Sequence, residues 1–426
     1  MHDRSRYYGS NFKAWWTTVY GSIEAAIENA TSPSELAYTA QTGDVQTPGS
    51  YTGQLMVALE KVGGQEYASI GALAYRQTLA ATKLTVNNAS ASMPTMVNFL
   101  KEISTNGDMQ TMDVVYPASP MLLYSNPELL RLLLIPVLNF ANNGTHTKFT
   151  NPFSPHQIGT YPIADATTGS QEPMPMENTG NMFLMLAGIV QRQPSAAWLQ
   201  PYMPMLTTWA DYLIGSLPFP ANQLCTDDFT GRLANNTNLA AKGIVALEAF
   251  SHICTAVGGA GCDKYSKAAT GFAPTWTKYA LEQQPKPHYK IAYNFPNSYS
   301  IKYNLVWQKL LNFSGPFPWK EVVAQTEVPY YLSHANKFGP PMDSRHTYVK
   351  LDWLSWGATM ADTDEGFHAM MDPVYAQANV TACRVPLTDL FDTISATCAY
   401  GKKAFVARPV VGGVFAKMLA PGPYPF

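Results

Sequence analysis

Apolar residues recur with a helical spacing along almost the whole chain. Apolar positions three and four residues apart mark one face of an α-helix. Many of these segments begin after Ser, Thr, Asp or Pro and stop at Gly or Asn, the residue types that favour helix ends. The pattern predicts helices over 12–29, 51–62, 65–82, 118–141, 178–192, 195–215, 237–257, 262–283, 303–313, 319–335, 351–376 and 403–419.

Long segments rich in Pro, Gly, Asn and aromatic residues separate these helices. They cover 83–117, 143–177, 217–236, 284–302 and 336–350. Loops of such length are uncommon unless they are functional. The order helix, short turn, helix, long loop repeats about six times, which is typical of a closed ring of helix pairs. We therefore predict a mostly all-α fold, an (α/α)6 toroid in which long loops at one end form one pocket. No strand-rich region or linker is evident, so residues 1–426 are expected to be a single domain.

Composition narrows the class of protein. The chain of 426 residues is 46% hydrophobic, carries a net charge of -2 and has only 14% charged residues. This charge gives no field that would attract nucleic acid or an anionic bilayer, so we expect neither partner. The longest apolar run, 129–140, is too short for a membrane span of about 20 residues. The N-terminus lacks the apolar stretch of a signal peptide, so a secreted protein would be a processed part of a longer precursor.

Two features favour the secretory pathway and an extracellular location. Asn-x-Ser/Thr sequons exceed the roughly three that chance gives, so N-linked glycans are expected. They occur at Asn29, Asn88, Asn143, Asn235, Asn312 and Asn379.

The cysteines support the same compartment. Cys254 and Cys262 flank a Gly-rich turn, and Cys383 and Cys398 bracket another loop. Local pairs across loops suit an oxidising compartment, so both pairs are predicted disulfides. Cys225 is left over and is interpreted as a buried free thiol. No CxxC, HExxH or other metal signature occurs, so neither a metal site nor a cofactor is expected.

Candidate chemistry lies in the long loops, which carry acids that an apolar pattern does not explain. Glu177 precedes an apolar helix, where it is either a catalytic acid or an acid that only stabilises the helix N-terminus. Asp227 and Asp228 stand before a Gly and also fit an Asx turn. Asp352 starts a Trp-rich helix, where it is either an N-cap or an acid whose pKa is raised by its surroundings. Arg345 and Arg408 either bind a carboxylate or hold loops in place.

Carboxylates without a metal, a Ser-His-Asp signature or a phosphate loop suit hydrolysis by general acid/base catalysis. Aromatic loops with paired acids are also typical of glycosidase pockets. The residues alone therefore predict a hydrolase-like pocket built on carboxylates.

Six of these segments together resemble a known family. They read KEISTNG from Lys101, HQIGTYP from His156, EPMPMENTGN from Glu172, NQLCTDDFTG from Asn222, DSRHTYVKLDW from Asp343 and RPVVGGVFA from Arg408. Their types and order resemble the fungal glutaminase A family of secreted proteins with a six-hairpin helical toroid, and the resemblance covers essentially the whole chain. Family members usually carry a β-rich domain before this region. We expect that domain to be missing from this chain and to be a partner of it.

The resemblance implies hydrolysis of L-glutamine to L-glutamate and ammonia. For this reaction we expect acid/base roles for Glu177, Asp228 and Asp352, and substrate contacts by Asp227, Arg345, Arg408, Tyr161 and Lys242. The chain departs from the family pattern at three places: Gln157 and Asn178 replace acids and Val414 replaces a histidine.

Two alternatives remain open. Trp and Tyr in the loops and the fold analogy favour a glycoside-active or sugar-binding toroid. The three departures favour a non-catalytic secreted member of the family. The expected small-molecule substrate is accordingly an amino acid or a sugar.

Overall fold

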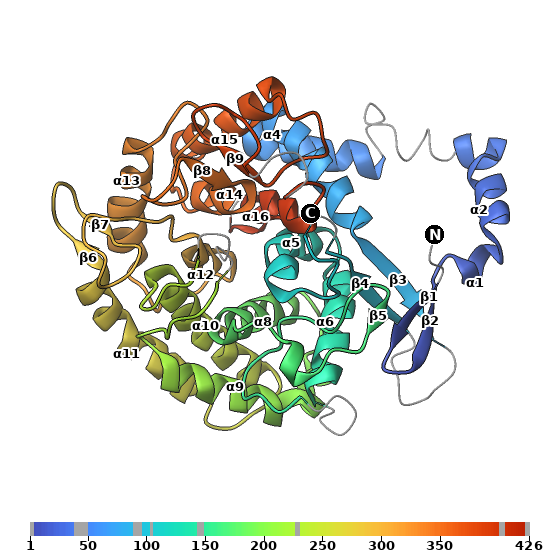
Figure 1. Ribbon diagram of the computed structural model, residues 1–426, viewed down its shortest axis with the longest axis horizontal. Coiled ribbons are helices and arrows are strands. Elements are labelled where there is room, and N and C mark those ends of the chain that lie inside the picture. Colours follow the sequence, from blue (N-terminus) through green and yellow to red (C-terminus); the bar gives the residue numbers. More distant parts are fainter. Residues whose placement is uncertain are drawn as a thin grey trace.

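The computed structural model describes residues 4–37, 50–87, 96–102, 105–142, 149–225, 231–399 and 405–421. Its main body is a ring of helices (Figure 1). Six elements line the inside of the ring, each in contact with the next, and the last contacts the first and closes the circle. In ring order they are α5 (Met112–Ser125), α8 (Pro175–Val190), α10 (Thr237–Ala256), η4 (Tyr303–Leu305) with α12 (Val306–Leu310), α14 (Leu351–Thr359), and η6 (Pro409–Phe415) with α16 (Ala416–Leu419).

A second circle of helices surrounds the first (Figure 1). Each outer helix immediately precedes its inner partner in the chain, so the molecule consists of helical hairpins that all run from outside to inside. This arrangement confirms the predicted (α/α)6 toroid. The outer elements are α4 (Tyr51–Ala80), α6 (Pro127–Asn142), η2 (Ala197–Tyr202) with α9 (Met203–Ser216), α11 (Asp263–Ala280), the π-helical η5 (Lys320–Glu327) with α13 (Val328–Ser333), and α15 (Asp364–Val380).

The two circles differ in sequence pattern because they differ in burial. The outer helix α11 buries one stripe only, made of Tyr265, Ala269, Ala273, Trp276 and Ala280, at the spacing of one helix face. The inner helix α8 is buried on every side from Met176 to Ile189. By length and hydropathy the inner helix α10 could cross a membrane, but most of it is buried within the ring, as in the core helix of a globular protein.

Aromatic rings fill the centre of the ring. Trp353 of α14 stacks on Tyr303 of η4, with ring centroids 4.1 Å apart. Tyr116 of α5 stacks on Trp307 of α12 and meets the edge of Trp356. These side chains come from three inner elements and are all less than 2% exposed. Such aromatic contacts stabilise a core beyond the area they bury, so they hold the inner elements at fixed spacing.

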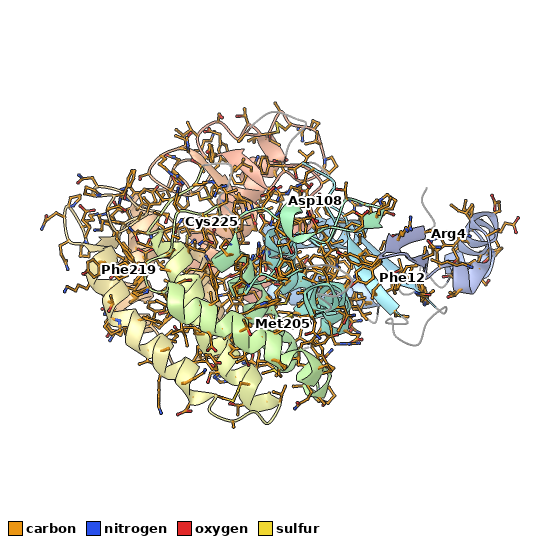
Figure 2. The ribbon with its side chains drawn as sticks, turned by 60° about the horizontal axis from the view of Figure 1, so that its bottom comes forward. Arg4, Phe12, Asp108, Met205, Phe219 and Cys225 are labelled. Atoms are coloured by element: carbon orange, nitrogen blue, oxygen red, sulfur yellow. A yellow bond between two sulfur atoms is a disulfide. The ribbon has the colours of Figure 1, made fainter. Side chains whose placement is uncertain are left out.

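A five-stranded sheet at the side of the ring was not predicted. Its order is β4-β3-β2-β1-β5, with β1 and β5 parallel and the other neighbours antiparallel. Figure 2 shows Arg4 and Phe12 in this region. The strands are β1 (Arg4–Tyr7), β2 (Ser10–Ala14), β3 (Thr82–Val86), β4 (Met96–Leu100) and β5 (Ile163–Ala164).

The helix predicted over 12–29 is wrong at its start. Residues 12–14 belong to β2, in which Phe12 and Ala14 are buried while Lys13 is exposed, the alternation of a strand. Helical structure follows in two short pieces, α1 (Thr17–Tyr20) and α2 (Ile23–Ala30).

Two other predicted helices each proved to be two. The segment 118–141 is divided at Asn126, whose extended backbone before a proline separates α5 from α6. The segment 351–376 is divided where Thr363 accepts a hydrogen bond from the Gly366 N–H and begins α15. The predicted separation of 51–62 from 65–82 matches a break inside α4, where Gly63 and Gly64 leave helical geometry.

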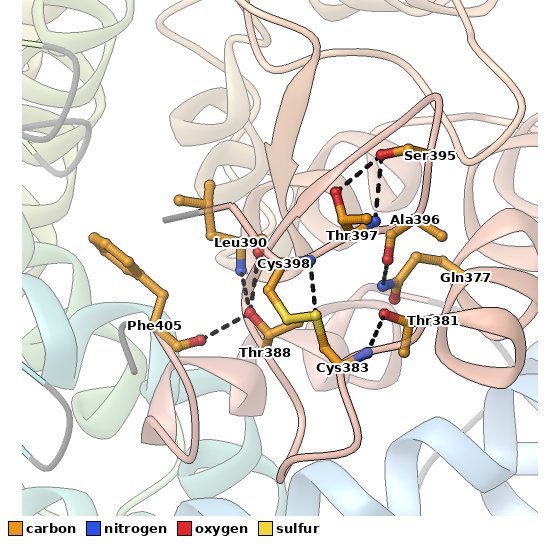
Figure 3. Close-up of a disulfide and its surroundings, with 10 residues drawn as sticks. All are labelled: Gln377, Thr381, Cys383, Thr388, Leu390, Ser395, Ala396, Thr397, Cys398 and Phe405. Atoms are coloured by element: carbon orange, nitrogen blue, oxygen red, sulfur yellow. Dashed lines mark hydrogen bonds between the residues drawn. A yellow bond between two sulfur atoms is a disulfide. The ribbon is translucent and has the colours of Figure 1, made fainter. Parts of the chain in front are cut away.

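The loops carry the remaining elements and both predicted disulfides. Cys254–Cys262 and Cys383–Cys398 are bonded, which confirms the pairing, and Figure 3 shows the second. Cys225 is buried and outside both bonds. The loop elements are η1 (Thr168–Ser170) and the two-stranded sheets of β6 (Leu281–Glu282) with β7 (His288–Tyr289) and of β8 (Tyr348–Lys350) with β9 (Leu390–Asp392).

Candidate functional site

The long loops all gather at one end of the ring. Each runs from an outer helix to the beginning of its inner partner, whereas the return connections from inner to outer helices are short. The N-termini of the inner elements therefore face the loops. Because a helix N-terminus carries a partial positive charge, this end of the ring favours acidic side chains. The burial of several carboxylates here follows from the topology.

A cavity of about 280 Å³ opens at this end. Its walls come from the loops that enter α5, α8 and η6. Three acids, one histidine and one arginine lie among its lining residues, which are Glu102, Thr105, Asn106, Thr111, Asp113, Val114, His156, Glu172, Phe405 and Arg408.

Arg408 lies in the wall of this cavity, just before η6. Its Nε is 3.1 Å from Glu102 Oε1, and its Nη1 is 3.6 Å from Asp389 Oδ2. Neither Nε nor Glu102 Oε1 makes a hydrogen bond within the described part of the chain, because the two groups are close but not aligned. The Gln77 side chain of α4 donates to the Arg408 carbonyl at 2.9 Å and fixes its backbone. The guanidinium therefore lies between Glu102 and Asp389, and its Nε makes no hydrogen bond to any described residue.

Behind Arg408, two further aspartates share one lysine. Lys350 Nζ is 3.0 Å from Asp352 Oδ2 and 4.0 Å from Asp389 Oδ2, and all three side chains are buried. The pairing of β8 with β9 sets Lys350 opposite Leu390 and so brings the aspartates together. Both carboxylates lack hydrogen bonds among the described residues. Burial raises the pKa of Asp352 to about 6, with Lys350 opposing and Asp389 adding to the shift. Burial also raises the pKa of Asp389.

His156 stands between two acids of the cavity. Its Nδ1 is 3.8 Å from Asp113 Oδ1, and its Nε2 is 3.7 Å from Glu172 Oε2. Asp113 lies in the first turn of α5 and is buried, and burial raises its pKa although His156 and Arg408 oppose the shift. Both gaps exceed the length of a direct hydrogen bond. The imidazole therefore lies between two carboxyl groups without bonding directly to either.

Glu177 and Lys242 form a separate buried pair. Lys242 Nζ donates to Glu177 Oε1 and, at 2.7 Å, to Asn181 Oδ1, and it lies 4.3 Å from the centre of the Tyr116 ring. Gly180 makes this possible, since a Cβ there would stand 2.7 Å from Lys242 Cγ. Glu177, Gly180 and Asn181 share one face of α8. The spacing of the E-N-T-G-N segment is thus explained by packing around Lys242.

The other predicted substrate contacts lie apart from the cavity. Arg345 Nη2 is 2.6 Å from Asp343 Oδ2 and its Nε donates to Asp343 Oδ1 at 3.1 Å, so a neighbour in its own loop binds it. Tyr161 accepts a hydrogen bond from Lys83 Nζ at 3.2 Å and lines another cavity of about 450 Å³ beside Trp15. Asp227 and Asp228 lie outside the described residues.

The predicted acceptor asparagines are placed as follows. Asn29, Asn312 and Asn379 are exposed, and Asn235 is half-buried. Asn88 and Asn143 fall outside the described residues. An acceptor must be accessible, so the exposed three fit modification best.

Sequence reasoning did not select several members of the site. Glu102 and His156 entered the sequence analysis only as parts of the family segments, and neither Asp113 nor Asp389 was selected. A signal for Asp389 exists, since it is the one charged residue in the run from Val385 to Phe391. A lone charge in an apolar stretch is costly to bury and therefore informative. In the described ranges no group of three or more His, Cys, Asp or Glu side chains is arranged to hold a metal ion.

Comparison with known proteins gives a consistent picture. A family model for the glutaminase A six helical-hairpin domain matches residues 64–418. Glutaminase A of Aspergillus oryzae (strain ATCC 42149 / RIB 40) is 36% identical over 361 residues, which are 84% of this chain and 50% of that protein. A probable glutaminase of Arthroderma benhamiae (strain ATCC MYA-4681 / CBS 112371) is 29% identical over 450 residues, covering 86% of this chain and 51% of that protein. The chain spans about half the length of these curated relatives.

Solved structures are similar in fold alone. A wild-type glycosidase superposes with a TM-score of 0.59 at 10% identity, covering 84% of this chain and 99% of the glycosidase. A glycosidase variant in complex with glucose gives 0.57 at 11%, with 86% and 99% covered. A metal-independent alpha mannosidase of Streptococcus pneumoniae gives 0.53 at 9%, with 86% and 97% covered.

Proposed function

This chain belongs to the glutaminase A six helical-hairpin family, and on that premise we propose that it is the helical part of a glutaminase. The reaction is hydrolysis of the side-chain amide of L-glutamine to L-glutamate and ammonia. The observation that carries the proposal is the cavity whose lining includes Arg408 together with Glu102, Asp113, His156 and Glu172. Two relatives bear the name glutaminase, which supports the substrate class.

The charges of the cavity suit a free amino acid. Arg408 is the cation in the lining and binds the substrate carboxylate, since a guanidinium pairs with a carboxylate through two parallel hydrogen bonds. Glu102 and Glu172 attract the ammonium group. Because acids outnumber bases in the lining, the site favours zwitterionic glutamine over glutamate, whose side chain is an additional anion. Charge repulsion therefore helps the product to leave.

His156, Asp113 and Glu172 carry the proton transfers. A water held beside His156 gives one proton to the imidazole, backed by Glu172, and its oxygen bonds to the amide carbon. Asp113, whose raised pKa favours the protonated form, donates to the leaving nitrogen as the carbon–nitrogen bond breaks. The water oxygen becomes the new carboxyl oxygen, and the second water proton is released from the new carboxyl group. The imidazolium passes its proton to Asp113, which replaces the proton that left with ammonia. Asp352 and Asp389 act through Arg408 and Lys350 as positioning residues.

The proposed mechanism gives two of the predicted catalytic acids other roles. Glu177 is bound by Lys242 and is better suited to holding α8 against α10. Asp352 is 3.0 Å from Lys350 and does not line the cavity. An acid/base role for Asp228 and a substrate contact for Asp227 stay predictions.

The two arginines provide a matched test of substrate binding. Ammonia release from L-glutamine by the purified protein is measured for wild type, Arg408→Lys and Arg345→Lys. Lysine keeps the charge and loses the planar two-bond geometry. We expect Arg408→Lys to raise KM about 10- to 100-fold and Arg345→Lys to leave it within about twofold, because Asp343 already binds Arg345. Absence of ammonia release by wild type, or the opposite order of the two variants, refutes the proposal.

Glycoside hydrolysis is the second candidate. It is favoured by carboxylates gathered in one cavity and by the glycosidases that share the fold. Release of reducing sugar from oligosaccharides without ammonia release would select it. A non-catalytic role is the third candidate. Release of neither ammonia nor reducing sugar would select it. It is motivated by Gln157, Asn178 and Val414, of which Gln157 bonds to the Ser170 carbonyl of its own loop at 3.1 Å.

We also propose that the protein is extracellular and N-glycosylated. The two disulfides and the exposed sequons at Asn29, Asn312 and Asn379 support this location. Enzymatic removal of N-glycans from the protein in culture supernatant should lower its apparent mass. A protein confined to the cytoplasm, with reduced cysteines, would contradict the proposal.

A further inference from the structure

A larger cavity, of about 550 Å³, lies on the outside of the ring. Its floor is the groove between the neighbouring outer helices α4 and α15. Ile70, Leu73 and Gln77 of α4 face Val374 and Ala378 of α15 across it. Its roof is the segment 383–388, which the Cys383–Cys398 disulfide and a hydrogen bond of 3.0 Å from Gln77 Nε2 to the Leu387 carbonyl hold in place. A volume of this size suits a small organic molecule.

The lining of the outer cavity is mostly apolar and includes two cationic residues. Most of the lining is aliphatic, and the only charged residues in it are Arg76 and Arg384, both exposed, with no acid among the rest. No ion pair of either arginine occurs within the described ranges. Arg76 comes from α4 and Arg384 from the roof, so two cations of different elements border one apolar space. This combination matches a molecule with an aliphatic body and one anionic head.

Three residues in the wall of the outer cavity are chain neighbours of charged residues at the centre of the ring. Leu351, Thr388 and Ala407 line the outer cavity, and each directly precedes Asp352, Asp389 or Arg408 in the chain. Figure 3 shows Thr388 beside the disulfide, where its hydroxyl donates to the Phe405 carbonyl at 2.9 Å. Phe405 in turn lines the central cavity. A molecule in the outer cavity therefore packs against the backbone that carries the charged residues of the central one.

We propose that the outer cavity is an effector site for an anionic amphiphile, with a medium-chain carboxylate as its simplest form. The aliphatic chain lies between α4 and α15, and Arg76 and Arg384 bind the carboxylate. Binding of the amphiphile fixes the backbone at residues 351, 388 and 407. It thereby changes the positions of the side chains of Asp352, Asp389 and Arg408. The binding step does not depend on the proposed hydrolysis, whereas the effector role rests on it.

Calorimetric titration with decanoate tests the binding step. Decan-1-ol has the same chain without charge, and decyltrimethylammonium has the opposite charge. We expect saturable binding of decanoate, weaker binding of decanol and the weakest binding of the cation. The double variant Arg76→Gln/Arg384→Gln should lose about tenfold in decanoate affinity and keep its decanol affinity. Ala378→Trp, which fills the groove, should abolish binding of both.

The results distinguish the binding site from its effector role and from the proposed hydrolysis. No saturable binding of decanoate up to about 1 mM, or binding that neither variant changes, overturns the site. Kinetics of ammonia release with saturating decanoate then test the effector role: we expect KM for glutamine to change at least about twofold in wild type and not in Ala378→Trp. Binding with unchanged kinetic constants overturns the effector role. Binding in a protein that releases no ammonia refutes the proposed hydrolysis and the effector role with it, and leaves the binding site in place.

Discussion

Two clusters of buried charge lie on different sides of the same ring and differ in one respect. Around Lys302 every group is satisfied: its Nζ donates to the carbonyls of Tyr289 and Ser300, each at 2.8 Å. Glu327, 4.0 Å from that Nζ, accepts from the Tyr289 N–H at 3.1 Å and from the Tyr331 hydroxyl. Around Arg408, by contrast, Asp352 and Asp389 have no hydrogen bonds in the described part of the chain.

The contrast separates structure from function. A buried polar group that makes no hydrogen bond costs about 1–3 kcal/mol, and the ion pairs of Asp352 and Asp389 offset only part of that cost. A protein keeps such groups where they have another role. The Lys302 cluster is as buried as the Arg408 cluster, yet neither Lys302 nor Glu327 lines the central cavity. Burial of charge alone therefore does not mark a site. Burial together with unused hydrogen-bonding capacity beside a cavity does.

The largest expected effect comes from breaking the satisfied cluster. Glu327→Ala leaves the Lys302 ammonium without its counter-charge and removes the acceptor of the Tyr289 N–H and the Tyr331 hydroxyl, which costs about 3–5 kcal/mol of unfolding free energy. Denaturant midpoints at neutral pH measure the change. Lys302→Met/Glu327→Gln should recover much of the loss, because it removes the remaining charge. A single variant as stable as wild type would show that this pair does not stabilise the ring.

In the Arg408 cluster, removing the charge of Asp352 should raise the free energy of unfolding. Asp352 has a folded pKa of about 6 against an ordinary value of 3.8, so its contribution to stability is fully present below pH 3.8 and is lost as the pH rises through 6. Asp352→Asn mimics the neutral carboxyl. It should therefore be more stable than wild type by about 1–3 kcal/mol at pH 8 and equal to it at pH 4. Unfolding curves at both pH values decide, and destabilisation at pH 8 would contradict the account.

Lys302 has a pH dependence of its own. Burial lowers its pKa to about 8 from 10.5, with Glu327 opposing. Its contribution to stability is present above pH 10.5 and is lost as the pH falls through 8. The pH dependence of unfolding between 8 and 10 should therefore flatten in Lys302→Met. An unchanged profile would mean that Lys302 does not titrate in this range.

A smaller effect tests the paired Glu177–Lys242 contact. Gly180→Ala places a methyl group 2.7 Å from Lys242 Cγ and should cost about 1–3 kcal/mol by overpacking. Gly215→Ala in α9, with nothing within 4 Å of the new Cβ, should be stabilising by about 0.5–1 kcal/mol. Thermal melts of the two variants give the comparison. Equal melting temperatures would remove the packing explanation of Gly180.

The sequence predicted the ring well and the sheet poorly, for physical reasons. Helix periodicity is local, so the hairpins could be recognised from neighbouring residues. The sheet depends on a strand pair as distant as Arg6 and Ile163, and its strands are only two to five residues long. No local pattern encodes such a pairing.

The site shows the same limit. Arg408 and Asp352 were selected because they stand in unusual local surroundings. Asp389 and Glu102 become members only when closure of the ring brings their loops to Arg408. Six loops distant in sequence meet at one end, and that meeting is a property of the topology.

The most direct test of the central claim is the kcat/KM for ammonia release by Asp113→Asn, with Asp263→Asn as the control. Asp113 is buried in the cavity beside His156, whereas Asp263 is exposed and paired with Lys267 on α11. Loss of a general acid lowers the rate by about a hundredfold or more, so the account predicts that loss for Asp113→Asn and wild-type activity for Asp263→Asn. Wild-type activity in a folded Asp113→Asn protein would contradict it.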